Sequence, residues 1–415
     1  MDIRGIGAAA KAASRIIGTS TDETRSAALR AIAEALEARS AEIFAANEAD
    51  LAAARDSGMS AAMLDRLALN ESRVKGMAQG ALELIDVPDP LDRVFDERVR
   101  PNGLKITKKA VPLGVIAIIY EARPNVTVDA AVLCLKSGNA VILKGGKEAI
   151  NSNLKLGEIM RSALESAGLP ADCVTVVPDT SREAANALMT LNEYVDVLIP
   201  RGGKGLISAV VKNATVPTIE TGTGNCHAFV DASADLNMAA DIIYNAKTSR
   251  PSVCNALETA LIHADIAEGF LPLMKAKLDE KQVELRGCER ARAILGDCVK
   301  PASESDWADE FLDYILAVKV VDGLDEALAH IARYSTGHSE AIITRDQENA
   351  ARFLREVDAA AVYVNASTRF TDGGEFGMGC EMGISTDKLH ARGPVGIREL
   401  TTYKYVVHGT GQIRK

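Results

Sequence analysis

The fold is decided by a stretch that begins Gly114-Val-Ile-Ala-Ile-Ile-Tyr120 and ends Ala140-Val-Ile-Leu-Lys144. Both runs are short, apolar and rich in β-branched residues, which is typical of buried strands. Residues 128–136 lie between them and are predicted to form a helix. A strand, a helix and a second strand indicate a parallel pair joined by a crossover. Because both runs are apolar apart from Lys144 at the end of the second, we expect helices on both faces of the sheet.

The same alternation continues along the chain and predicts an α/β fold. Further strands are expected at 174–177, 195–199, 227–231, 257–263, 341–344 and 361–365, and further helices at 152–167, 181–190, 205–213, 266–278, 324–334 and 347–356. The polar segment 288–307 has no predicted element. Before the alternation, an alanine-rich helical block ends at Pro88-Asp-Pro90, because proline cannot continue a helix. Its first capping box is Ser20-Thr-Asp-Glu23, with Ser20 as the expected N-cap.

Two segments outside this pattern, residues 98–109 and 400–408, alternate polar with apolar side chains. The first contains Pro101-Asn-Gly103, a turn signal that predicts a β-hairpin. We expect the second segment to extend the sheet of the hairpin. Such an arm suits pairing with a second subunit, and an ordinary surface hairpin is the alternative.

Length, charge and cysteine content narrow the class of protein. The chain has 415 residues, 47% hydrophobic content and a net charge of −10. These values suit two or three domains and argue against binding to nucleic acid or to an anionic membrane. The seven cysteines show no Cys-x-x-Cys spacing, so neither a disulfide nor a metal site is expected. The N-terminus lacks a signal-peptide pattern and the run 111–120 is too short to span a bilayer, which predicts a cytoplasmic location.

One cysteine stands in a setting that suits a nucleophile. The segment Lys247-Thr-Ser-Arg250-Pro-Ser-Val-Cys254 forms a polar, cation-bearing loop just before an apolar strand. A cation such as Arg250 lowers the pKa of a nearby thiol, and the thiolate is the reactive form. The alternative is a small buried hydrophobic residue, which is the usual role of a free cysteine.

Glycine turns with cations follow two of the predicted strands. Lys144-Gly145-Gly146-Lys147 ends one strand, and Arg201-Gly202-Gly203-Lys204 lies between another strand and a helix. Ligands gather at the carboxyl ends of parallel strands, and glycines let the backbone approach a phosphate. Together the two turns favour a dinucleotide site, although either alone is also common without a ligand.

Three further clusters carry polar side chains suited to a site. Arg123 and Asn125 follow the strand that ends at Tyr120, and they suit a carboxylate and an oxyanion. Glu220 precedes a glycine-rich turn and is a candidate base or ribose ligand, with a plain turn as the alternative. Residues 370–383 combine many glycines with carboxylates, which favours a loop that lines a site.

Five motifs occur in the order found in one enzyme family. They are Tyr120-Glu-Ala-Arg-Pro-Asn-Val-Thr127, Ile199-Pro-Arg-Gly-Gly203, Glu220-Thr-Gly-Thr-Gly-Asn-Cys-His227, Ser249-Arg-Pro-Ser-Val-Cys-Asn255 and Glu375-Phe-Gly-Met-Gly379. Over essentially the whole chain, they closely resemble the gamma-glutamyl phosphate reductases, also called glutamate-5-semialdehyde dehydrogenases, of the aldehyde dehydrogenase superfamily.

The resemblance implies roles for individual residues. Cys254 matches the nucleophile, Glu220 the general base, and Asn125 is the expected oxyanion donor. The cofactor-binding residues are expected to be Lys144, Gly145, Lys147, Gly202, Gly203, Glu375 and Phe376. Substrate contacts are expected at Arg123, Arg250 and Asn255. Aldehyde dehydrogenases often carry a glutamate where this chain has Lys147, and a cation there favours the 2′-phosphate of NADPH.

The resemblance also implies three structural parts. Residues 1–97 and 113–225 would form a Rossmann-like NADP-binding domain, and residues 226–368 a catalytic domain with the cysteine. Residues 98–112 and 396–415 would form an oligomerisation flap. Residues 369–395 would be a glycine-rich segment that returns to the cofactor domain and the active site.

The implied activity is reduction of L-glutamyl 5-phosphate by NADPH through a cysteine thioester, giving L-glutamate 5-semialdehyde and phosphate in L-proline biosynthesis. Two alternatives remain: an NAD(P)-dependent aldehyde dehydrogenase for another small semialdehyde, and a non-catalytic dinucleotide-binding redox sensor. The expected assembly is a homo-oligomer, dimer or larger. A contact with the upstream glutamate kinase is a further open expectation.

Overall fold

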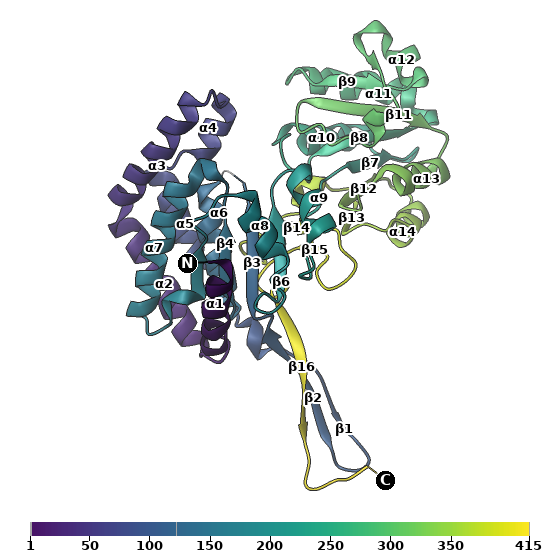
Figure 1. The fold of residues 1–415 in the computed structure, drawn as a ribbon. Coiled ribbons are helices and arrows are strands. Elements are labelled where there is room, and N and C mark those ends of the chain that lie inside the picture. Colours follow the sequence, from purple (N-terminus) through teal and green to yellow (C-terminus); the bar gives the residue numbers. More distant parts are fainter. Residues whose placement is uncertain (1, 122, 415) are drawn as a thin grey trace. The chain divides into compact units, whose positions relative to one another are not determined.

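The computed structural model describes residues 2–121 and 123–414, which divide into two compact units (Figure 1). Unit 1 consists of Met1–Thr221, Gly377–Gly383 and Val395–Lys415, and unit 2 of Gly222–Phe376 and Ile384–Pro394. Each unit has its own parallel sheet, with four strands in unit 1 and seven in unit 2. The α/β architecture expected from the alternating pattern is confirmed.

The helical block predicted for the N-terminal part of the chain opens unit 1. Its helices are α1 (Ile3–Ile17), α2 (Asp22–Ala38), α3 (Ser40–Asp56), α4 (Ala61–Leu67) and α5 (Glu71–Glu83). Leu29, Ile32 and Leu36 of α2 lie on one face and are fully buried. This spacing is that of a helix packed by one apolar stripe against a core.

The cap of α2 corrects one prediction. Its N-cap is Thr21, not Ser20, and Thr21 Oγ1 accepts a hydrogen bond from the backbone N–H of Thr24 at 3.3 Å. Ser20 Oγ instead donates to the carbonyl of Ile17 at 2.7 Å, at the end of α1. Both hydroxyls can cap a helix, and the short connection assigns one to each of the two helices.

The central sheet of unit 1 has the strand order β5-β4-β3-β6. Its strands are β3 (Val115–Tyr120), β4 (Ala140–Lys144), β5 (Val174–Val176) and β6 (Val197–Arg201), and its helices are α6 (Pro124–Lys136), α7 (Ile150–Ser166), α8 (Arg182–Met189) and α9 (Lys204–Asn213). Every residue of β3 and β4 is buried, as their apolar sequences predict. The order places β4 and β6 on opposite sides of β3, which is a topological switch point.

Two boundaries differ from the predicted ones for local reasons. Helix α6 begins at Pro124, four residues early, because proline is favourable at the first helical position. Strand β6 begins two residues late, at Val197. The backbone N–H of Val195 donates to the carbonyl of Leu191 at 2.9 Å, which holds Val195 in the preceding turn.

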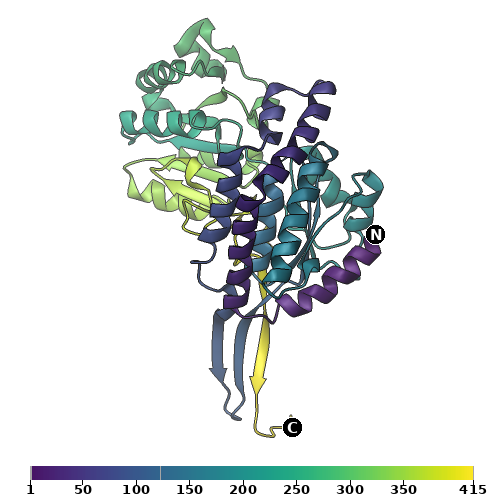
Figure 2. The same cartoon turned by 90° about the vertical axis from the view of Figure 1, so that its left-hand side faces the viewer.

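A separate antiparallel sheet joins the two arm segments of unit 1 in the order β1-β2-β16. Its strands are β1 (Val94–Val99), β2 (Lys105–Pro112) and β16 (Thr401–His408). The register pairs Tyr405 with Lys108, so the predicted extension of the hairpin by the C-terminal segment is confirmed. Figure 2 shows the three strands leaving unit 1 side by side. We call this sheet the flap.

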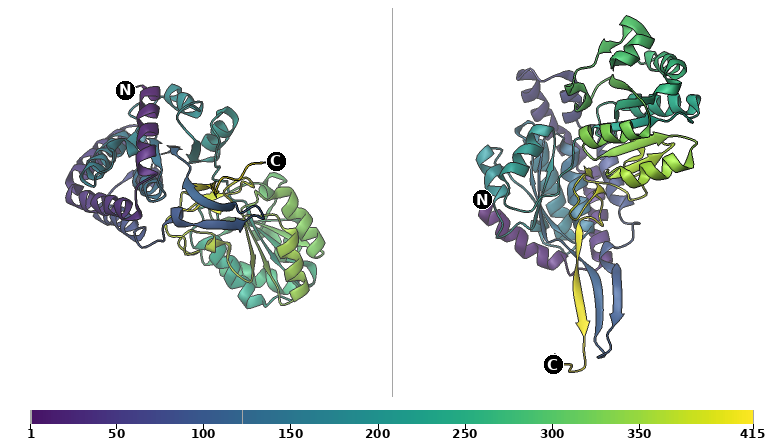
Figure 3. Two further views of the ribbon diagram at one scale, coloured as in Figure 1. Left: turned by 90° about the horizontal axis from the view of Figure 1, so that it is seen from below. Right: turned by 90° about the vertical axis from the view of Figure 1, so that its right-hand side faces the viewer.

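Unit 2 is built on a parallel sheet with the order β10-β9-β11-β8-β7-β12-β13. Its strands are β7 (Cys226–Val230), β8 (Leu257–His263), β9 (Glu284–Gly287), β10 (Lys300–Pro301), β11 (Ile315–Val321), β12 (Ser339–Ile343) and β13 (Ala361–Val364), and its helices are α10 (Leu236–Thr248), α11 (Ala264–Asp279), α12 (Glu289–Leu295), α13 (Leu324–Tyr334) and α14 (Gln347–Glu356). Helices α10–α12 share one buried cluster with the sheet, while α13 and α14 share another (Figure 3). A short pair, β14 (Ile384–Ser385) with β15 (Gly393–Pro394), completes the unit.

Several elements of unit 2 were not predicted from the sequence. Helix α10 and strands β9 and β11 were missed, and the unassigned segment 288–307 contains α12 and β10. A lysine, Lys319, interrupts the apolar run of β11; its ammonium pairs with Glu326 at 3.0 Å. Among the described residues, no helix combines the length and the apolar character needed to cross a membrane.

Candidate active site

Cys254 lies in a short loop between the end of α10 at Thr248 and the start of β8 at Leu257. A buried ion pair joins the two elements that flank this loop. Lys247 Nζ donates to Glu258 Oε2 at 2.6 Å, and both side chains are fully buried. This finding corrects the expectation that Lys247 belongs to a cation-bearing loop, because it is part of the last turn of α10 and is turned into the core.

Burial removes this pair from water and shifts the pKa of both groups toward their neutral forms. Burial lowers the pKa of Lys247, while the charge of Glu258 acts in the opposite direction. Burial likewise raises the pKa of Glu258 to about 7, against the lowering effect of Lys247. Each charge therefore depends on its partner, because an unpaired charge at this depth would be highly unfavourable.

The start of β7 lies directly against the loop that carries Cys254. The thiol of Cys226 donates to the carbonyl oxygen of Cys254 at 3.3 Å, and His338 Nδ1 lies 3.8 Å from the same sulfur. A Cβ atom added at Gly224 would come within 1.4 Å of that carbonyl oxygen. Only glycine fits at this close approach, which holds the backbone of the loop that carries Cys254 in place.

The other side of the loop is held by a residue that the sequence analysis did not identify. Arg369 donates through one guanidinium nitrogen to Asn255 Oδ1, and through Nε to Ser249 Oγ at 3.1 Å. Asn255 Nδ2 donates to the carbonyls of Arg369 and Thr371 at 3.3 and 3.0 Å. The amide of Asn255, which was expected to contact substrate, is buried and engaged in positioning the loop.

Cations do gather beside Cys254, as the sequence predicted. Arg250 is exposed in the same loop. The pKa of Arg369 is lowered mainly by burial and, to a smaller extent, by the charge of Arg250. Cys254 itself is partly exposed, whereas Cys134, Cys173 and Cys226 are buried. Burial raises the pKa of all three buried thiols, to about 12 for Cys173, which suits structural rather than reactive cysteines.

The predicted cofactor residues Lys144, Gly145 and Lys147 lie together at the carboxyl end of β4. Lys144 Nζ donates to the carbonyl of Thr180 at 3.0 Å, and burial lowers its pKa. A Cβ atom at Gly145 would lie 2.2 Å from Asn153 Nδ2, a buried donor with no hydrogen-bond partner among the described residues. A glycine, an unused donor and exposed Lys147 fit the hydroxyls and phosphate of a nucleotide.

The second glycine turn already holds an anion from the chain itself. The backbone N–H of Gly203 donates to Glu121 Oε2 at 2.9 Å, at the start of α9. A Cβ atom at Gly202 would lie 2.6 Å from the same oxygen. The turn therefore binds a carboxylate, as its geometry predicts, and a cofactor phosphate at this position would have to displace Glu121.

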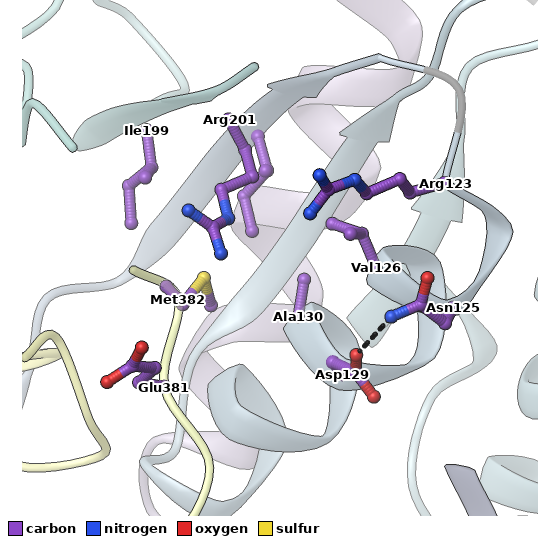
Figure 4. A pocket seen from close by; sticks show the side chains of 10 residues that line it. Arg123, Asn125, Val126, Asp129, Ala130, Ile199, Arg201, Glu381 and Met382 are labelled. Carbon is purple, nitrogen blue, oxygen red and sulfur yellow. Dashed lines mark hydrogen bonds between the residues drawn. The ribbon is translucent and has the colours of Figure 1, made fainter. Parts of the chain in front are cut away.

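Arg123 and Asn125 are brought together with residues of β6 and of the segment 377–383. They line a pocket with an open volume of about 440 Å³. Its lining residues are Ile118, Arg123, Asn125, Val126, Asp129, Ala130, Ile199, Arg201, Glu381 and Met382. Figure 4 shows the side chain of Arg123 extending toward Arg201, whose guanidinium group points toward the side of the pocket where Met382 lies. All of these residues belong to unit 1.

The remaining predicted residues lie at the ends of the units. Glu220 is half-buried beside Thr221, whose Oγ1 donates to the carbonyl of Pro200 at 2.8 Å. Glu375 and Phe376 are exposed in a turn that ends the main segment of unit 2. The backbone N–H of Phe376 donates to the carbonyl of Asp372 at 3.0 Å, which fixes this turn.

Comparison with known proteins agrees with this architecture. The aldehyde dehydrogenase family model matches residues 1–293. A gamma-glutamyl phosphate reductase of Heliobacterium modesticaldum is 59% identical over 98% of each chain, and that of Moorella thermoacetica is 56% identical over 100% of this chain and 99% of its own. The crystal structure of gamma-glutamyl phosphate reductase from Thermotoga maritima has a TM-score of 0.99 and 49% identity, covering 100% of both chains. This chain belongs to the aldehyde dehydrogenase family and, within it, to the gamma-glutamyl phosphate reductases.

Proposed function

We propose that this protein catalyses the reduction of L-glutamyl 5-phosphate by NADPH to L-glutamate 5-semialdehyde and phosphate, in L-proline biosynthesis. The observation that carries the proposal is the full-length similarity to gamma-glutamyl phosphate reductases, together with the anchored loop that presents Cys254. The two alternatives, hydrolytic oxidation of another semialdehyde and a redox sensor without turnover, have no such support from the relatives.

Cys254 acts as the nucleophile. Its thiolate attacks the acyl carbonyl, phosphate leaves, and a thioester forms on the sulfur, so that one difficult step becomes two easier ones. Phosphate is a good leaving group, so its departure needs no strong acid. Arg250 and Arg369 supply positive charge beside the loop, which favours the thiolate.

The contacts around Cys254 fix the position of its backbone. Cys226, Gly224 and Asn255 fix the backbone around the sulfur from two sides, which suits a nucleophile that must meet its carbonyl at a defined angle. Glu220 is the expected base of aldehyde-oxidising relatives. Because water must not cleave the thioester in the reductive direction, we assign Glu220 a minor role in this reaction.

The residues at the end of β4 fit the adenosine part of NADPH. When bound, NADPH supplies the hydride that reduces the thioester. We propose that Lys144 and Gly145 contact the adenosine ribose and that exposed Lys147 offers a cation for a 2′-phosphate. We further propose that Glu375 and Phe376 contact the nicotinamide ribose, and that Gly202 and Gly203 bind a cofactor phosphate once Glu121 has moved.

The proposal is tested in the reverse direction with glutamate 5-semialdehyde, NADP⁺ and phosphate. We expect NADPH formation that requires phosphate, and no turnover in Cys254→Ala with NADPH binding retained. Cys134→Ala and Cys173→Ala serve as matched controls and should keep activity. Phosphate-independent oxidation to glutamate would favour a hydrolytic aldehyde dehydrogenase, and near-normal turnover by Cys254→Ala would contradict the mechanism.

We propose that the flap joins two copies of this chain into a homodimer or a larger assembly. Its strands expose Val99, Tyr405 and Val407, with exposed fractions of 71%, 61% and 54%. Apolar side chains on narrow sheets with open edges are typical of surfaces that pair with another chain. The cytoplasmic location and the contact with a glutamate kinase stay predictions.

A further inference from the structure

The pocket at the switch point of unit 1 gathers opposite charges around one opening. Arg123 follows β3 and Arg201 ends β6, so both guanidinium groups come from the carboxyl edge of the sheet. Asp129 comes from the second turn of α6, and Glu381 from the segment 377–383. The formal charges of the four side chains cancel. This edge is where open parallel sheets bind their ligands.

The arrangement of charges selects a class of ligand. A planar guanidinium pair binds a carboxylate or a phosphate well. The carboxylates of Asp129 and Glu381, however, line the same pocket and would repel a multiply charged phosphate. They would instead accept hydrogen bonds from an ammonium group. A ligand with one carboxylate and one ammonium matches both halves of the lining.

The side chain of Asp129 is positioned by a hydrogen bond so that it can bind such a cation. Asn125 Nδ2 donates to Asp129 Oδ2 at 2.9 Å, which fixes the carboxylate against the pocket (Figure 4). Burial raises the pKa of Asp129 to about 6, despite the opposing effects of Asn125 and of the charge of Arg201. A bound ammonium would stabilise the ionised form. The amide of Asn125 is thus engaged in positioning Asp129.

We propose that this pocket binds the α-carboxylate and the α-ammonium group of the amino-acid substrate, so that Arg201, Asp129 and Glu381 select the substrate together with Arg123. The inference rests on the proposed function. It assigns the carboxylate to Arg123 and Arg201 and the ammonium to Asp129 and Glu381. The apolar part of the lining, which includes Val126, faces the methylene groups of the substrate chain.

Three aldehydes test the assignment in the reverse reaction with NADP⁺ and phosphate. They are glutamate 5-semialdehyde, 5-oxopentanoate, which lacks the amino group, and 4-aminobutanal, which lacks the carboxylate. For each substrate, kcat/KM of a variant is divided by that of the wild type. Cyclisation of an aminoaldehyde lowers the free substrate concentration equally for the variant and the wild type, so it does not affect the ratio. A smaller amount of folded enzyme lowers the ratios for all three substrates equally, so it does not affect their comparison.

We expect Asp129→Asn and Glu381→Gln to lower kcat/KM for glutamate 5-semialdehyde by about 10- to 150-fold, the range of a charge-assisted hydrogen bond. These two variants should leave kcat/KM for 5-oxopentanoate nearly unchanged. Arg201→Gln should show the complementary pattern, with a loss for both carboxylate-bearing substrates and none for 4-aminobutanal. Arg201→Lys should restore part of the loss. Arg55→Gln, on the exposed face of α3, is the control and should change no ratio.

Two results would overturn the proposal while leaving the proposed function intact. One is an equal loss on all three aldehydes, which would show a general structural role. The other is a change in the KM of NADP⁺ alone in Arg201→Gln, which would show that the pocket holds the cofactor. If the wild type lacked phosphate-dependent turnover of glutamate 5-semialdehyde, the proposed function and this inference would fail together.

Discussion

Lys247 and Glu258 form a fully buried ion pair, 2.6 Å long, across the two ends of the loop that carries Cys254. One partner ends α10 and the other lies in β8. The pair therefore connects the helix before Cys254 with the strand after it. Its burial makes each charge dependent on the other, so the loop ends are fixed by a contact that is lost completely when either partner is removed.

We expect Lys247→Met to lower the free energy of unfolding by about 3–5 kcal/mol, the cost of leaving a buried charge without its partner. Urea unfolding measures this loss. The double variant Lys247→Met/Glu258→Leu should recover most of it, because an apolar pair replaces the ion pair. Lys75→Met breaks the exposed pair with Glu71 and should have little effect. A loss in Lys247→Met as small as that in Lys75→Met would contradict the prediction.

The hydrogen bond from Cys226 to the carbonyl of Cys254 leads to a second prediction. Cys226→Ala removes the donor to the carbonyl of Cys254 and should lower kcat several-fold, since the backbone at Cys254 loses one of its contacts. Cys226→Ser retains a donor and should keep more of the activity. Steady-state kinetics compares the two variants, and equal values of kcat would show that the hydrogen bond does not matter for turnover.

Lys147 is expected to determine the preference for NADPH over NADH. A charge-assisted contact with the 2′-phosphate is worth about 10- to 150-fold in affinity, so Lys147→Glu should narrow or reverse the preference. Titrations with both cofactors, followed by nicotinamide fluorescence, give the two dissociation constants. Lys212→Glu introduces the same change of charge on α9 and should leave the ratio unchanged. Equal affinity of the wild type for both cofactors would refute this role.

The flap should be necessary for assembly. Deletion of residues 401–415 removes β16 and leaves one edge of β2 without its strand partner. We expect monomers or aggregates of the truncated chain in light scattering, and a dimer or larger species of the intact chain. A mass near 44 kDa for the intact chain at micromolar concentration would exclude the proposed assembly.

Stability should fall in mild acid because of His338. Burial lowers the pKa of this fully buried histidine from 6.5 to about 4. The unfolded chain therefore takes up a proton before the folded one does, and stability is lost as the pH falls from 6.5 toward 4. At pH 5 the loss should be about 2 kcal/mol. Urea unfolding at pH 7 and pH 5 should show a smaller difference in His338→Asn, and equal differences would argue against this assignment.

The fold was predictable wherever burial alone determines the sequence. The strands β4 and β8 have the predicted bounds, because most of their residues are buried on both faces and apolar, although β8 also carries buried Glu258. The joining of 98–109 with 400–408 was also expected, since both alternate outside the main pattern. Helix α10 was missed because its buried end carries Lys247, a residue that normally marks a surface.

Candidate site residues could be proposed from the sequence, but their contacts could not. Cys254 and Arg250 were proposed from their local sequence, and their roles stay predictions. Arg369 could not, because it is more than a hundred residues away and reaches the loop only through the fold. Glu121, which occupies the turn at Gly203, was not predicted, because its partner lies 82 residues further along the chain. Hydrogen bonds between distant side chains depend on tertiary placement, which no local pattern encodes.

The third strand of the flap is synthesised long after the other two. Strand β2 pairs with β1 across a short turn, but its other partner, β16, begins at Thr401, opposite Pro112. At synthesis rates of about 5–20 residues per second, the intervening chain takes roughly 15–60 s to emerge. Throughout that time one edge of β2 has no intramolecular strand to bind. A chain that stops before Thr401 would keep this open edge.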